Sequence, residues 1–225
     1  MMNKSRSIVK GLVVLLASLL IYGCGATPKA APSGFLKDAP PFQPGPADGA
    51  DQIYVKPGSD LKKYRRVMLD EVQFYLKKDA ANQGLQASEL KELADTFHRA
   101  FFEALGTAYP LVTEPGSDVL RIRVAITDIE PSNPALSGIT TVLPVGLAVS
   151  VVKKAGSGAH TGVGGASMEA EFLDAMTNER LAAANDTFSG SKLSGLSKLG
   201  ATEEAFEFWA KRLRVTLDKI HGTSK

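Results

Sequence analysis

Apolar and polar side chains alternate along several stretches in the second half of the chain. Because successive side chains of a β-strand point to opposite faces, this period of two predicts strands. Residues 119–129 and 166–172 alternate most clearly, and residues 180–188 follow a turn at 174–179 as a hairpin partner. Three alanines at 182–184 leave a helix as the competing prediction for that last stretch.

Two other stretches repeat apolar residues at a spacing near four, which is the pattern of an amphipathic helix. The first is predicted to begin with Ser88 as its N-cap, and the second to begin at Thr202 and end at Gly222. Runs rich in β-forming residues at 53–55 and 64–74 predict two earlier strands. The helical stripes expected to be buried are Leu90, Ala94, Phe97, Phe101 and Leu105, and Phe206, Trp209, Leu213, Leu217 and Ile220.

The predicted order of elements is β-α-β, an insertion, and then β-β-α. A β-α-β unit favours a right-handed crossover and two parallel strands, here 64–74 and 119–129. The strands that follow are expected to add antiparallel. We therefore predict an α+β fold, with a mixed sheet of about four strands and two helices packed on one face.

The N-terminus shows a different pattern, three cations followed by an uncharged, largely apolar run over residues 11–21. These are the charged and apolar regions of a secretory signal. The run of 11 residues is shorter than the roughly 20 that a transmembrane helix needs. A stretch rich in Pro, Gly and Ala follows, so we predict a signal peptide at 1–23, a flexible tether at 24–50 and a single α+β domain at 51–225.

Cys24 ends the signal region and is the only cysteine of the chain, so an intramolecular disulfide and a Cys-based metal cluster are excluded. Leu20-Ile21-Tyr22-Gly23-Cys24 resembles the lipobox of bacterial lipoproteins. The resemblance implies cleavage after Gly23 and acylation of Cys24, and two or more acyl chains make attachment durable. The same resemblance implies the outer membrane, with the domain facing the periplasm, because Gly25 replaces the Asp that favours the inner membrane.

The charge balance bears on the class of partner. The chain has 26 Lys+Arg and 24 Asp+Glu, a formal net charge of +2. Three cations leave with the signal, so the mature part keeps 23 basic and 24 acidic side chains and a formal charge of −1. Without a basic excess, nucleic acid is not an expected partner. The expected partners are the membrane, through lipid on Cys24, and an envelope protein or a second copy of the chain.

Residues 131–165 form an apolar insertion between the predicted strands. Its first part, 131–152, contains no charged side chain and is interrupted by prolines and glycines. One interpretation is an additional core element, and the other is an exposed element that binds lipid or a protein partner. The candidate residues for that contact are Leu136, Ile139, Val142, Leu143, Val145 and Leu147.

Signals for catalysis and cofactor binding are weak. The glycine-rich stretch 156–165 lacks the Lys-Ser/Thr end of a phosphate-binding loop. The three histidines, His98, His160 and His221, do not have metal-binding spacing. We therefore expect no catalytic residue, no metal site and no cofactor, and a protein that is not an enzyme.

Charged residues share faces on two of the predicted strands. Arg121 and Arg123 lie on the polar face of one strand, and Glu169 and Glu171 lie on one face of another. If these strands are neighbours, the opposite charges are expected to form cross-strand ion pairs.

Five short stretches stand in a fixed order behind the lipobox, at residues 33–36, 49–55, 64–70, 142–146 and 169–174. Together they resemble the uncharacterised bacterial lipoprotein family called domain of unknown function 3313. The resemblance covers the chain from the tether to near the C-terminus. It implies an exported lipoprotein, and it supplies no activity, cofactor or catalytic residue.

The leading functional hypothesis is an outer-membrane-anchored lipoprotein that serves as a non-enzymatic binding or assembly component of the cell envelope. The alternative is a lipid- or small-molecule-binding transport accessory protein, with a pocket between the helices and the sheet. A periplasmic hydrolase is the third class, and it would require a deep pocket with His98 or His160 beside a carboxylate.

The anchor gives a direct prediction. Cys24→Ser removes the thiol that accepts the lipid, so the protein should leave the membrane fraction and lose metabolic labelling with palmitate. Fractionation and labelling of cells that express each form measure this. Unchanged labelling of the serine variant would rule out Cys24 as the lipidated residue.

Overall fold

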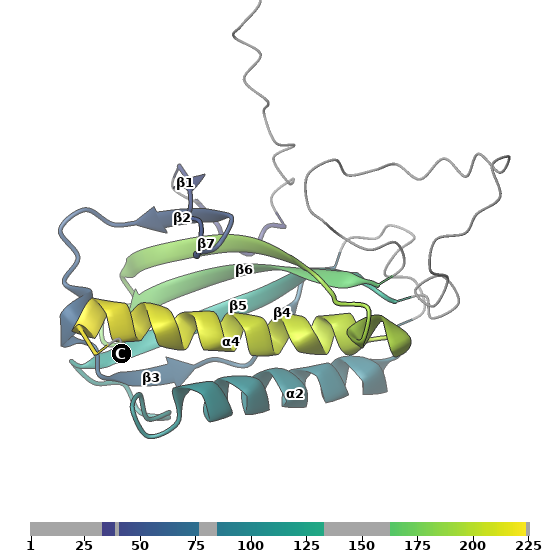
Figure 1. The fold of residues 1–225 in the computed structure, drawn as a ribbon. Helices are drawn as coiled ribbons and strands as arrows, with labels where there is room; N and C mark the ends of the chain where they lie inside the picture. Colours follow the sequence, from purple (N-terminus) through teal and green to yellow (C-terminus); the bar gives the residue numbers. More distant parts are fainter. Residues whose placement is uncertain (1–32, 39–40, 77–84, 133–162, 224–225) are drawn as a thin grey trace, which may run out of the picture. The chain divides into compact units, whose positions relative to one another are not determined.

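The computed structural model describes residues 33–38, 41–76, 85–132 and 163–223, and over these the chain forms one mixed sheet and two long helices (Figure 1). The helices are α2 (Ala87–Leu105) and α4 (Gly200–His221), and two short 3-10 turns are η2 (Leu61–Lys63) and η4 (Ser194–Leu196). The strands are β1 (Gln43–Pro44), β2 (Gln52–Val55), β3 (Arg66–Leu69), β4 (Gln73–Phe74), β5 (Val119–Glu130), β6 (Gly165–Asp174) and β7 (Arg180–Ser189).

The strand order confirms the α+β class and the mixed pairing. The sheet runs β1-β2-β7-β6-β5-β3, and β4 also pairs with β5. Both β3 and β4 are parallel to β5, whereas β6 and β7 add antiparallel as a hairpin. The three alanines at 182–184 therefore belong to a strand, and the competing helix prediction is wrong.

The sheet has seven strands, so the prediction of about four was too low. The stretch 64–74 divides into β3 and β4, because the chain leaves the ladder between Leu69 and Gln73 and then returns to β5. At the other edge, β2 pairs with β7, and β1 pairs with β2. Strand β1 contains Pro44 and lies in the proline-rich stretch, where composition indicated a tether.

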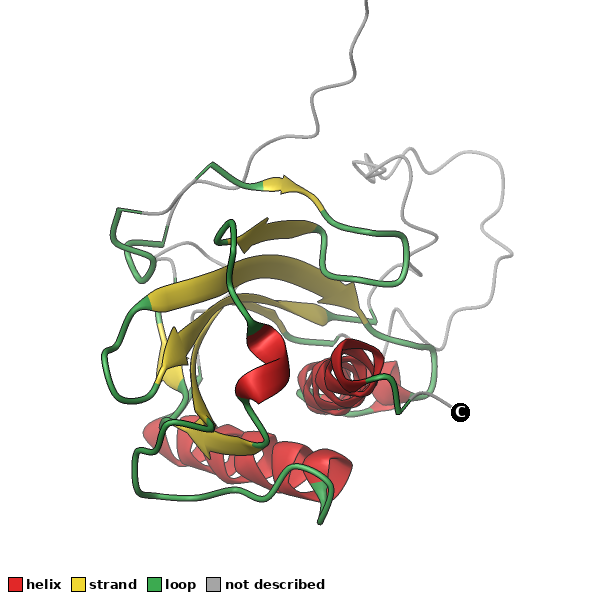
Figure 2. Cartoon of the chain, turned by 90° about the vertical axis from the view of Figure 1, so that its left-hand side faces the viewer, coloured by secondary structure: helices red, strands yellow, loops and turns green. Residues whose placement is uncertain are grey.

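Alternation along β5 separates the two faces of the sheet. Ile122 and Val124 are buried in the main core, whereas Arg121 and Arg123, which alternate with them, point to the other face and stay about one-third exposed. Helices α2 and α4 both contribute to that core, and both lie on one face of the curved sheet (Figure 2). The large side chains that are almost fully buried in this core include Phe97, Leu105, Phe206, Trp209, Ile122 and Ile126.

The helix boundaries differ slightly from the predicted ones. The N-cap of α2 is Gln86 rather than Ser88, because Gln86 and Glu89 form a reciprocal capping box that satisfies free amides of the first turn. Helix α4 begins at Gly200, two residues before the predicted Thr202. Its end at Gly222 is confirmed: this residue adopts a left-handed conformation, which glycine reaches without steric cost.

A buried carboxylate attaches α4 to the sheet. Asp186 on β7 is 4% exposed, and it accepts hydrogen bonds from Trp209 Nε1 at 2.7 Å and Arg212 Nη1 at 2.6 Å. It also accepts one from the backbone amide of Asp51 at 2.9 Å. Burial raises the pKa of Asp186, while the Arg212 charge and these hydrogen bonds oppose that shift. One carboxylate thus connects the C-terminal helix, the hairpin and the turn before β2.

The packed domain begins at or before Ser33, whereas the sequence predicted a tether up to residue 50. Phe35 and Leu36 are 4% and 8% exposed, and they pack on Ala125 of β5 on the face opposite the helices. Apolar side chains dock because burial removes their surface from water. Among the described residues, no helix is both long and apolar enough to cross a membrane.

Asp186→Ala should lower the free energy of unfolding by about 3 kcal/mol, because it leaves the buried Arg212 charge and the Trp209 N–H without a partner. Urea denaturation measures the change. Glu207→Ala is the matched control, since it breaks an exposed ion pair with Lys211 on the same helix and should cost less than about 1 kcal/mol. Equal losses for the two variants would contradict this account.

Candidate functional site

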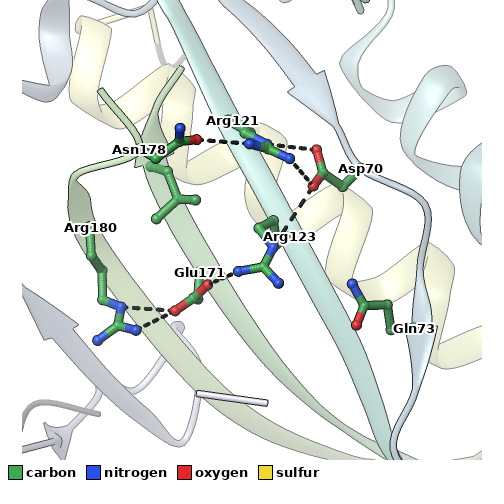
Figure 3. Close-up of a pocket in the computed structure, with 8 residues that line it drawn as sticks. Asp70, Gln73, Arg121, Arg123, Glu171, Asn178 and Arg180 are labelled. Atoms are coloured by element: carbon green, nitrogen blue, oxygen red, sulfur yellow. Dashed lines mark hydrogen bonds and ion pairs between the residues drawn. The ribbon is translucent and has the colours of Figure 1, made fainter. Parts of the chain in front are cut away.

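The sheet face opposite the helices contains a polar groove of about 470 Å³, which we call the outer-face groove. Side chains from β5, β6, β7, the β6–β7 turn and the segment after β3 converge on it (Figure 3). Strand alternation places them together: residues two apart on a strand share a face. The lining residues are Asp70, Gln73, Arg121, Arg123, Glu171, Leu173, Asn178 and Arg180.

Glu171 forms the centre of the groove and is only 3% exposed. Arg123, directly opposite it on β5, donates from Nη1 to Glu171 Oε2 at 2.7 Å. Arg180 on β7 donates from Nε to Glu171 Oε1 at 2.9 Å, and its Nη2 contacts the same oxygen. Two guanidinium groups thus compensate the carboxylate for its lost hydration. The expected cross-strand pairing is confirmed for Arg123 and Glu171.

Arg121 forms a second ion pair at one end of the groove. Its Nε and Nη2 donate to the two carboxylate oxygens of Asp70 at 2.9 and 2.7 Å, a bidentate arrangement. The hydrogen bonds to Asp70 raise the pKa of Arg121. Arg121 Nη1 also donates to Asn178 Oδ1 at 2.8 Å. Asn178 lies in the β6–β7 turn at a φ of 58°, a conformation that asparagine tolerates better than most residues.

The sequence also allowed an ion pair between Arg121 and Glu169. The structure does not contain it, because Arg121 pairs with Asp70. Glu169 instead accepts hydrogen bonds from the backbone amide and the hydroxyl of Ser33, at 3.2 and 2.7 Å. Its position on β6 is two residues from Glu171, so the same face that builds the groove also binds the N-terminal segment.

The segment Ser33–Asp38 contacts two of the arginines that line the groove. Arg180 donates to the carbonyl oxygens of Lys37 and Asp38 at 2.9 and 3.2 Å. The Arg123 guanidinium lies 5.1 Å from the centre of the Phe35 ring, within the range of a cation–π contact. Both arginines that hold Glu171 therefore also hold the N-terminal segment against the sheet.

The chemistry of this site is polar recognition. Guanidinium, carboxylate and amide groups line it, and they offer charge and directional hydrogen bonds. Its two carboxylates, Asp70 and Glu171, are each engaged by arginine. Among the described residues, no group of three or more His, Cys, Asp and Glu side chains could hold a metal ion.

Most of the residues that the sequence singled out lie outside the described part of the chain. This is true of Gly23 and Cys24, of His160, and of the insertion contacts Leu136, Ile139, Val142, Leu143, Val145 and Leu147. The two other histidines are not among the groove residues: His98 packs edge-on against Phe97, and His221 Nδ1 lies 3.1 Å from the Tyr109 hydroxyl.

The two ends of the insertion are held together at one end of the sheet. The Ser132 hydroxyl donates to the Val163 carbonyl at 2.6 Å, and the Ser132 amide donates to the Lys198 carbonyl at 2.8 Å. The chain thus leaves and re-enters the described domain beside η4 and its flanking residues. Leu193 and Leu196 in that turn are 78% and 60% exposed.

The sequence did not identify the groove as a site. Asp70, Gln73, Asn178 and Arg180 come from two stretches that are far apart in the chain, 70–73 and 178–180, and no short motif joins them. One signal was available for Arg180: it is the only cation of β7, and four apolar residues, 181–184, follow it directly. Such a charge requires a partner across the sheet or from a loop.

Comparison with known proteins gives one family match. The family model described as "Protein of unknown function (DUF3313)" matches residues 31–213, a span that includes the groove and α2 and most of α4. No curated protein matches the chain.

Solved structures show distant likeness. The PelC dodecamer from Paraburkholderia phytofirmans is 11% identical, with a TM-score of 0.40, and the alignment covers 72% of this chain and 96% of that one. Protein XCC0632 from Xanthomonas campestris is 8% identical, with a TM-score of 0.38 and coverage of 76% and 94%. A candidate lipoprotein from Caulobacter crescentus is 10% identical, with a TM-score of 0.29 and coverage of 73% and 95%.

Phe35→Ala should release the N-terminal segment from the sheet. The lost burial is worth about 2 kcal/mol, so amide exchange at Ser33, Phe35 and Lys37 should accelerate roughly 30-fold. Hydrogen-exchange mass spectrometry of the full chain measures this. Phe102→Ala, at a ring that is 65% exposed on α2, is the control and should leave these amides unchanged. Unaltered exchange in the Phe35 variant would show that the ring does not hold the segment.

Proposed function

The chain belongs to the DUF3313 family of proteins of unknown function, and we propose that it is an outer-membrane lipoprotein whose domain is a non-enzymatic binding component of the envelope. The observation that carries this proposal is the outer-face groove, in which three arginines, two carboxylates and two amides surround an open volume of about 470 Å³. Two of these arginines, Arg123 and Arg180, also contact the segment 33–38, which leads back toward Cys24. The binding surface and the membrane anchor are thus joined by a short piece of chain.

The length of that piece limits how far the domain reaches from the membrane. Ser33 lies nine positions after Cys24, and nine extended residues span at most about 30 Å. A free tether up to residue 50 would allow about three times that distance. Because Ser33 is hydrogen-bonded to Glu169, lipid on Cys24 would allow Ser33 to move no farther than about 30 Å from the membrane. A component that acts at the envelope surface benefits from such a position.

The state of the carboxylates supports binding rather than catalysis. Glu171 is buried between Arg123 and Arg180, and both of its oxygens are occupied by arginine N–H groups. Asp70 is bound by Arg121 through both oxygens. A general acid or base must exchange a proton with substrate, whereas these carboxylates are fixed as partners of permanent cations. They shape the groove and set its charge.

The alternative is a transport accessory protein that binds a lipid or another small molecule. The sequence placed its pocket between the helices and the sheet, but that space holds Phe97, Phe206 and Trp209, each at most 2% exposed. A ligand-binding role would therefore use the outer-face groove. The apolar insertion is a second contact candidate, since its ends emerge beside the exposed Leu193 and Leu196.

Site-specific photo-cross-linking tests the proposal. A photoreactive phenylalanine analogue replaces Tyr75, an aromatic side chain that is 38% exposed and packs edge-on against Phe35 at the groove rim. The matched control carries the same group at Phe102 on α2. In living cells, we expect an adduct of defined mass from position 75, lost when Arg180→Ala is added, and none from position 102.

Each result has a distinct meaning. A protein adduct supports an assembly role, and a lipid or small-molecule adduct supports the transport alternative. Equal adducts from both positions, or adducts that survive Arg180→Ala, would contradict the groove as the binding surface.

A further inference from the structure

The charges that line the outer-face groove do not cancel. Arg121, Arg123 and Arg180 contribute three positive charges, whereas Asp70 and Glu171 contribute two negative ones. The two carboxylates lie against the arginines, so no other acid of the lining balances the third cation. A concave site with one net positive charge attracts an anion.

Hydrogen-bond donors remain free at one side of the groove. Arg123 uses Nη1 for Glu171, and its Nε is 3.8 Å from Asp70, which is an ion-pair distance rather than a hydrogen bond. Within the described residues, its Nη2 and the side-chain amide of Gln73 have no hydrogen-bond partner. Figure 3 shows both groups turned toward the same part of the groove. They present donors to one small volume.

The rim beside these donors is aromatic. Phe35 lies under the Arg123 guanidinium, and Tyr75 packs edge-on against Phe35 with ring centres 5.5 Å apart. Gln73 and Tyr75 are two residues apart, so both project from the same side of the extended chain. Phe35 is buried, whereas Tyr75 is 38% exposed, so a ligand with an anionic group and an adjoining apolar part would find donors next to the Tyr75 ring.

We propose that the outer-face groove binds a phosphate group, which Arg123 and Gln73 hold by hydrogen bonds and which neutralises the unbalanced arginine charge. A guanidinium matches the tetrahedral oxygens of phosphate in geometry as well as charge. The inference rests on the proposed function in one respect: anchoring through Cys24 would bring the groove near the phosphates of lipid headgroups. The same chemistry would bind a free phosphate or a soluble phosphate ester.

Gln73→Glu is the decisive variant. It keeps the size of the side chain and puts a carboxylate where the phosphate would bind, so that the carboxylate pairs with Arg123 and repels the ligand. We expect the Kd for inorganic phosphate to rise at least about tenfold, the effect of losing one charge-assisted hydrogen bond. Gln43→Glu, on exposed β1, adds the same charge outside the groove and should leave the Kd within about twofold, since its field is screened by salt.

The measurement is isothermal titration of the full chain in a non-ionic detergent, first with inorganic phosphate and then with a soluble short-chain phosphatidylglycerol. Thermal melts confirm that each variant is folded. Tighter binding of the phospholipid than of phosphate, lost in Gln73→Glu, identifies a headgroup as the ligand. Binding of phosphate alone with the same loss identifies a free phosphate or ester.

The phosphate inference would be overturned if neither probe bound saturably, or if Gln73→Glu and Gln43→Glu had equal Kd values. The proposed function would survive that result if the cross-link at position 75 still depended on Arg180. Conversely, phosphate binding without any dependence of the cross-link on Arg180 would leave the phosphate site and remove the partner role. The two proposals therefore fail separately.

Discussion

The carboxylate of Glu171 has left water almost completely, and its ionised form requires compensation at both oxygens. Arg123 and Arg180 supply it from the strands on either side of β6. Glu171 fixes the orientation of these two guanidinium groups, and this orientation determines which other groups they contact. Arg180 reaches the carbonyls of Lys37 and Asp38, and Arg123 covers Phe35. The outer face of the sheet is organised around this triad.

The triad also depends on the register of the central strands. Arg123 lies directly opposite Glu171, and a shift of one residue would exchange every inward and outward side chain of β5. The helix-facing side prevents such a shift, since Ile122 and Val124 are buried there against α2 and α4. Packing on one face therefore maintains the ion pairs on the other, and Asp186 attaches α4 so that this packing is kept.

The N-terminal segment shows how the two faces serve different purposes. Ala125 is small and completely buried, and it leaves room on the outer face for Phe35 and Leu36. The hydrogen bonds of Ser33 to Glu169 then bring the start of the domain to within nine residues of Cys24. Composition predicted a tether up to residue 50, but the packing of Phe35 and Leu36 on the sheet makes the stretch before the domain shorter than that. In the proposed lipoprotein, this contact sets an upper limit on the distance between Ser33 and the membrane.

Local patterns in the sequence determined much of the fold. Alternation predicted β5 and β6, and the turn after β6 predicted β7 as a hairpin partner. Helical spacing predicted α2 and α4, and shared strand faces predicted the pair of Arg123 with Glu171. Each of these depends on neighbours along the chain or on one adjacent strand. Tertiary structure alone decided that Asp70, Gln73, Asn178 and Arg180 meet around that pair, that Ser33 binds Glu169, and that Arg180 binds the carbonyl of Lys37. Those contacts join residues up to 143 positions apart. They arise from long-range packing and charge compensation, which no local period encodes.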